Sequence, residues 1–63
     1  MMYLVIYFES YVGYNLDENC CVFSDRALAQ VHADLLNIKL ADSCNCQVAD
    51  LGDLYVVEEI RRR

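Results

Sequence analysis

Residues 2–11 read MYLVIYFESY, and this stretch decides the fold that the sequence predicts. Aromatic and β-branched residues dominate it, which favours a β-strand. Successive side chains of a strand point to opposite sides, so the stretch has two faces. One face is wholly apolar and is assigned to the core: Met2, Leu4, Ile6 and Phe8. The other face is mixed and is expected to lie open: Tyr3, Val5, Tyr7, Glu9 and Tyr11.

Two further strands are expected beyond this stretch. Residues 12–18, VGYNLDE, contain turn formers and predict a loop, and residues 19–23, NCCVF, predict a second short strand. The short connection suits an antiparallel hairpin. Residues 54–60, LYVVEEI, predict the last strand. The stretch 38–53 predicts a loop that holds a short strand or a turn of helix near 47–51.

A helix is predicted from Asp25 to Asn37, with Ser24 as its N-cap. Apolar residues recur at i, i+3 and i+7, which predicts one buried face: Leu28, Val31 and Leu35. His32 borders this face and is expected to pack against a neighbour. The helix is therefore expected to be amphipathic and to cover one side of the sheet.

The length of 63 residues, 7.3 kDa, allows one small domain. The order of elements predicts an α+β fold of β-β-α-β type, with one amphipathic helix on a three- to four-stranded antiparallel sheet. Residues 1–60 form this domain, and residues 61–63 form a basic tail.

The charge distribution points away from nucleic acid. Ten acidic residues stand against five basic ones, for a net charge of −5. Three of the basic residues lie in the tail at 61–63, which leaves Arg26 and Lys39 in the body. Such a body repels phosphates and suits a partner protein with a basic surface.

The N-terminus carries no membrane or export signal that we can identify. Its apolar run stops at Glu9, short of the ~20 residues that span a bilayer, and it lacks a basic leading segment. We expect a cytoplasmic protein with no membrane partner.

Four cysteines leave three alternatives open: Cys20, Cys21, Cys44 and Cys46. Two disulfides would need an oxidising compartment. A zinc site with His32 is disfavoured, because zinc knuckles usually separate their cysteines by two to four residues and the first pair is adjacent. Free thiols are expected, and no metal ligand or cofactor is assigned.

No complete catalytic arrangement stands out in the sequence. Gly13 and Gly52 are the only glycines, so there is no glycine-rich phosphate loop. Glu58 and Glu59 are adjacent on a strand and point to opposite sides, so they cannot act as a carboxylate pair. We expect a protein that is not an enzyme.

An aromatic first strand, the segment V-F-S before a helix and a closing Y-V-V-E-E strand resemble small proteins of bacteriophages. The matching stretches are Tyr3–Phe8, Val22–Ser24, Ala27–Leu36 and Tyr55–Glu59. Some such proteins inhibit host machinery, anti-CRISPR proteins among them, and the resemblance implies this role here.

The function expected from these observations is that of a small acidic, non-enzymatic protein that binds and blocks a host protein. It would occlude a basic surface that holds nucleic acid. The same surface could instead join two copies into a homodimer. The candidate partner-binding residues are Tyr3, Val5, Tyr7, Tyr11, Glu9 and Glu59. The alternative is a small structural or zinc-binding domain that uses the cysteine loop.

Overall fold

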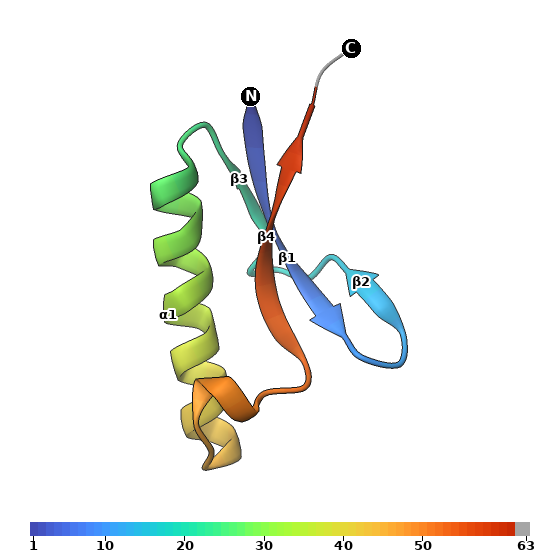
Figure 1. Ribbon diagram of the computed structural model, residues 1–63, viewed down its shortest axis with the longest axis vertical. Helices are drawn as coiled ribbons and strands as arrows, with labels where there is room; N and C mark the ends of the chain where they lie inside the picture. Colours follow the sequence, from blue (N-terminus) through green and yellow to red (C-terminus); the bar gives the residue numbers. More distant parts are fainter. Residues whose placement is uncertain (62–63) are drawn as a thin grey trace.

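The computed structural model describes residues 1–61 and confirms the α+β fold, with one helix on a four-stranded antiparallel sheet (Figure 1). Its elements are β1 (Met2–Glu9), β2 (Gly13–Asn15), β3 (Cys21–Phe23), α1 (Arg26–Cys44), a short 3-10 helix η1 (Val48–Asp50) and β4 (Leu54–Ile60). The predicted last strand and the predicted turn of helix near 47–51 are both confirmed. Of the basic tail at 61–63, only Arg61 lies within the described residues.

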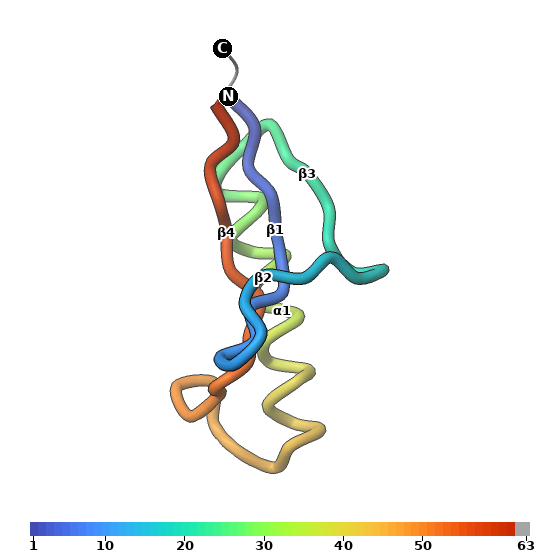
Figure 2. Tube along the Cα trace, turned by 90° about the vertical axis from the view of Figure 1, so that its right-hand side faces the viewer, coloured from blue at the N-terminus to red at the C-terminus, as the bar shows by residue number. Residues whose placement is uncertain are grey.

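β1 lies at the centre of the sheet (Figure 2). β4 pairs along its whole length on one edge, from Met2↔Ile60 to Phe8↔Leu54. The other edge is shared, because β3 pairs with the first half of β1 and β2 pairs with the second half. Residues 16–20 leave the sheet between these two short strands. The stretch predicted as a loop at 12–18 therefore contains a strand of its own.

The helix starts one residue later than predicted and ends well beyond the predicted end at Asn37. Its N-cap is Asp25, whose carboxylate accepts a hydrogen bond from the Ala27 N–H at 2.8 Å, so the assignment of the cap to Ser24 is wrong. No glycine or proline lies between Asn37 and Asn45, so the helix continues until Asn45 adopts a left-handed conformation at φ 56°.

The predicted faces are reversed in both layers. α1 buries its small residues, Ala29, Ala33 and Ala41, together with Asn37, while Leu36 packs at the border of the core and Leu28, Val31 and Leu35 lie outside. The sheet turns the opposite side of β1 to the helix from the one expected. The side chains in and around the core are Val5, Tyr55, Tyr3, Tyr7, Phe23 and Val57.

The reversal has a physical reason in how the two layers fit together. Protein interiors are close-packed, so large side chains on one layer need small ones opposite them. Alanines let α1 approach the sheet closely, and the tyrosine rings of the sheet fill the space between the layers. The expectation that Leu28, Val31 and Leu35 form the buried face is therefore wrong, as is the assignment of the Met2 face to the core.

Two smaller points complete the fold. The rings of His32 and Phe23 lie 5.4 Å apart, which confirms that this histidine packs against a neighbour. Within the described residues, α1 does not combine the length and apolarity that crossing a membrane requires.

Candidate functional site

The uncovered side of the sheet is apolar almost throughout, and we call it the open sheet face. Figure 1 shows α1 on one side of the sheet only. By strand alternation and register, its members are Met2, Leu4, Ile6, Phe8, Tyr14, Val22, Leu54, Val56, Glu58 and Ile60. None of these side chains is fully buried. A contiguous apolar surface of this kind is a candidate site for another molecule.

The polar groups of the open sheet face come from β2 and β4. Tyr14 packs its ring against Phe8, with the centroids 5.2 Å apart. A hydrogen bond with Glu58 and the charge of that carboxylate raise the pKa of Tyr14 above its ordinary value of 10.0. The only carboxylate of the face is thus matched by a hydroxyl of the same face.

A second apolar surface runs along the outer side of α1, and we call it the helix outer stripe. Its members are Leu28, Val31, Leu35 and Ile38, which are 57%, 55%, 55% and 49% exposed. At 100° per residue they lie opposite Ala33, which is fully buried. Both outer surfaces of this two-layer protein are therefore apolar.

Carboxylates lie beside the helix outer stripe. Asp34 follows the stripe on one flank and accepts a hydrogen bond from the Gln30 side chain at 2.9 Å. Asp42 continues the stripe toward the end of α1, while Lys39 lies on the other flank. The stripe is consequently a narrow apolar ridge with charged borders.

Three of the predicted partner-binding residues lie under the helix. Val5 is 0% exposed, and Tyr3 and Tyr7 pack against the core around it. The rings of Tyr7 and Tyr55 lie 5.0 Å apart, so Tyr7 joins β1 to β4. The expectation that these residues line an open binding face is wrong, because α1 covers that side of the sheet.

The other three predicted partner-binding residues lie at the ends of the strands. Tyr11 is 100% exposed at the tip of the β1–β2 hairpin. Glu9 accepts a hydrogen bond from the Asn15 amide at 3.0 Å. Glu59 lies 3.7 Å from the Arg61 side chain in an exposed ion pair. The structure does not bring these three residues together with the open sheet face, and their role in binding stays a prediction.

A hydrogen-bonded carboxylate ties the loop at 16–20 to β4. The Tyr55 hydroxyl donates to Asp17 at 2.7 Å, and the Asn19 N–H donates to the same carboxylate at 2.9 Å. Burial acts to raise the pKa of Asp17, but these hydrogen bonds and that of Cys20 outweigh it, so the pKa lies below its ordinary value of 3.8. Burial and the bond to Asp17 raise the pKa of Tyr55.

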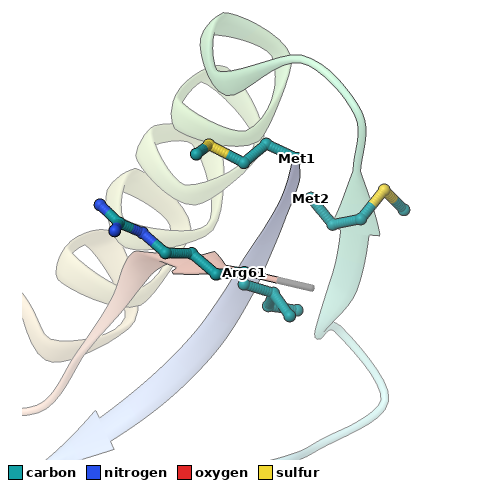
Figure 3. Close-up of a pocket in the computed structure, with 4 residues that line it drawn as sticks. Met1, Met2 and Arg61 are labelled. Atoms are coloured by element: carbon teal, nitrogen blue, oxygen red, sulfur yellow. The ribbon is translucent and has the colours of Figure 1, made fainter. Parts of the chain in front are cut away.

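A hollow of about 250 Å³ lies where β1 begins and β4 ends (Figure 3). Met1, Met2, Ile60 and Arg61 line it. Met2 and Ile60 are a cross-strand pair of the open sheet face. Figure 3 shows Met2 pointing to one side of the strand, and Met1 and Arg61 to the other. The hollow therefore lies at the end of the β1–β4 pair, with lining side chains on both sides of the sheet.

The cysteine loop borders a second hollow, of about 230 Å³, together with Tyr7 and Asp53. Burial, Cys44 and Asp50 raise the pKa of Cys46, which favours the unreactive thiol over the nucleophilic thiolate. All four cysteines carry free thiols. Among residues 1–61, no three histidine, cysteine or acidic side chains are grouped so that they could hold a metal ion. The zinc-binding alternative thus has no site in the described part of the chain.

Comparison with protein-family models, with curated proteins and with solved structures finds no match for this chain.

Sequence reasoning missed both surfaces, although a signal for each is present. Ala29, Ala33 and Ala41 recur every four residues or a multiple of four, which marks a helix face that can approach another layer closely. Once that face is inside, Leu28, Val31 and Leu35 lie outside. The helix then covers the side of β1 that carries Tyr3, Val5 and Tyr7, and the Met2 side is left uncovered.

Proposed function

We propose that the protein is a non-enzymatic binding module that docks the helix outer stripe in an apolar groove of another protein and thereby blocks it. The observation that carries this proposal is the exposure of Leu28, Val31, Leu35 and Ile38 on one ridge. Recognition of a helix in a groove uses apolar anchors at this spacing.

The sheet makes the helix a better ligand than a free peptide would be. Ordering a flexible segment on binding costs free energy, and a helix that is already folded avoids that cost. The other side of α1 is fixed to the sheet through Ala29 and Ala33, which are both 0% exposed. The ridge is consequently presented in its bound conformation.

Charge favours a partner whose groove has a basic rim. The chain carries a net charge of −5, and Asp34 and Asp42 border the ridge. Long-range attraction of this kind raises association rates and selects between partners. Proteins that hold nucleic acid carry basic surfaces of this kind, so we propose a target of that class. A phage-type inhibitor, an anti-CRISPR protein included, is the biological role that the resemblance favours for it.

The test is capture of the target from the cells that naturally make the protein. The full chain would be immobilised, and the bound proteins compared between wild type and Leu35→Lys. We expect Leu35→Lys to lose the target, because a lysine places a charge inside the apolar groove. Leu16→Lys is the matched control, since Leu16 is also exposed but lies in the loop at 16–20.

Salt provides a second measurement on the same sample. Binding to a basic rim should weaken as the salt concentration rises, because screening shortens the reach of exposed charges to ~8 Å at physiological ionic strength. Equal capture by wild type and Leu35→Lys would show that the ridge is not the binding site.

A further inference from the structure

We propose that the open sheet face is the interface of a homodimer, in which two copies of the chain pack sheet against sheet around a twofold axis. This inference concerns a different surface from the helix outer stripe, and it does not depend on the proposed target.

The composition of the face suits a permanent partner. Interfaces that form and dissociate are about as apolar as an ordinary protein surface, whereas homodimer interfaces are more apolar. Glu58 is the only charged residue of the open sheet face, and its carboxylate is matched by the Tyr14 hydroxyl. Glu58 is exposed on the edge strand β4, so its carboxylate can stay in solvent at the rim of the interface. A second copy is a partner that is present wherever the protein is made.

The hydrophobic core of a single chain is small. Its buried hydrophobic residues are Val5, Ala29, Ala33, Ala41 and Tyr55. Val5 is the largest side chain that is fully buried. The chain exposes 4775 Å², whereas a compact monomer of its mass exposes about 4,200 Å²; the chain ends and the hairpin tip contribute to this difference. A second sheet would turn the half-buried side chains of the face into core, as the two layers of a β-sandwich do.

The size of the face is sufficient for such an interface. Strand β1 has 8 residues, which at ~3.4 Å per residue extend over about 27 Å. Three strand widths at ~4.8 Å span about 14 Å. Two flat faces of this size would bury about 760 Å² in total, and the relief of the side chains raises this area toward the ~1,000 Å² lower limit for a specific interface.

The arrangement of the strands also suits self-association. β1 runs along the middle of the face, with β4 on one side and β2 and β3 on the other. A twofold axis between the sheets would place Ile6 of one copy near Ile6 of the other, so that a single patch is complementary to itself. The apolar surfaces of α1 would remain outside this dimer.

The first test is the molar mass of the wild-type chain by sedimentation equilibrium. We expect twice the chain mass of 7.3 kDa at about 100 µM, with the monomer appearing on dilution. A monomer at this concentration would overturn the inference and leave the face to a different partner.

The second test assigns the interface. We expect Ile6→Lys and Val22→Lys to lower the dimer fraction at least tenfold, and Leu35→Lys to leave it unchanged. Val22 is 47% exposed, so its replacement is tolerated by the fold of one chain even if that of Ile6 is not. Loss of the dimer in Leu35→Lys alone would assign the contact to the helix outer stripe instead.

A third measurement needs no substitution. Isotope-filtered NMR on a mixture of labelled and unlabelled chains detects contacts between copies. Methyl groups of Leu4, Ile6 and Val56 should show such contacts. Contacts from Leu28, Val31 and Leu35 in their place would overturn the inference.

Discussion

The side chain of Asn37 on α1 binds both backbone groups of Tyr55 on β4. Its Nδ2 donates to the Tyr55 carbonyl at 2.9 Å, and its Oδ1 accepts from the Tyr55 N–H at 2.7 Å. Asn37 is only 5% exposed, and both ends of its amide are satisfied. The amide thus stands where a neighbouring strand would pair, which blocks the edge of β4 at this point.

Asn37→Leu tests the contribution of this contact. The change keeps the branched shape and the number of heavy atoms but leaves the Tyr55 N–H and C=O without their partner, and each unsatisfied buried group costs about 1–3 kcal/mol. We expect the free energy of unfolding in urea to fall by about 2 kcal/mol or more. Gln30→Ala is the control, because it removes an exposed amide from the same helix and should have an effect within ~0.5 kcal/mol.

The two sides of α1 predict opposite outcomes for two further substitutions. Ala33→Leu forces a large side chain between the helix and the sheet and should cost about 1–3 kcal/mol or more. Leu35→Ala removes an exposed side chain from the helix and should change the stability by less than ~0.5 kcal/mol. Chemical denaturation of both variants measures this. A loss of several kcal/mol for Leu35→Ala would place the leucines inside the protein, contrary to the structure.

The N-cap distinguishes two neighbouring residues. Asp25→Ala should destabilise the protein by ~1 kcal/mol, because the Ala27 N–H loses its acceptor. Ser24→Ala should have a smaller effect, since its side chain makes no such bond to α1. Thermal unfolding of the two variants measures the difference. A larger loss of stability in Ser24→Ala than in Asp25→Ala would show that Ser24 is the N-cap.

Asp17 predicts a loss of stability in acid. Its pKa in the folded chain lies below 3.8, so its contribution is fully present above that value and is lost as the pH falls through the lower, folded pKa. Asp17→Asn should therefore flatten the acid side of the stability profile, measured by urea unfolding from neutral pH downward. A profile as steep as that of the wild type would assign the acid transition to other carboxylates.

The raised pKa of Tyr55, which donates to Asp17, predicts a pH dependence of stability in the opposite direction. Its pKa is raised above 10.0, so its contribution is present below that value and is lost as the pH rises through the folded pKa. Tyrosinate absorbance at alkaline pH follows this titration. In Tyr55→Phe the late-titrating component should be missing, and an unchanged titration curve would contradict the assignment.

The sequence was sufficient to predict β1, β3, β4 and the start of α1, because their signals are local, but it missed β2 and the last turns of α1. The aromatic run Tyr3–Phe8 indicates a strand, and the polar residues before Ala27 indicate the start of a helix. The faces could not be predicted in the same way. Both sides of β1 and both sides of α1 are apolar, so periodicity alone permits either orientation.

The choice of face depends on the fit between two elements. Ala33 lies inside because Tyr3, Tyr7 and Tyr55 provide the volume on the sheet side. The alanine spacing of α1 marks a face that can approach another layer, but it does not show which residues of the sheet lie opposite. The C-terminal end of α1 also could not be predicted from the sequence. Asp42 and Ser43 are typical of a loop, yet no glycine or proline among residues 38–44 stops the helix.

The pairing of β1 with β4 has a consequence for how the chain folds. The longest ladder of the sheet joins Met2 to Ile60, so almost the whole sequence separates the strands that need each other most. Closing so long a loop costs entropy before any contact is gained, and folding rates fall as contacting residues lie farther apart in the sequence. We expect this small domain to fold more slowly than a helical bundle of equal length. Until β4 has paired with it, β1 would be stabilised in the sheet only by its short neighbours β2 and β3.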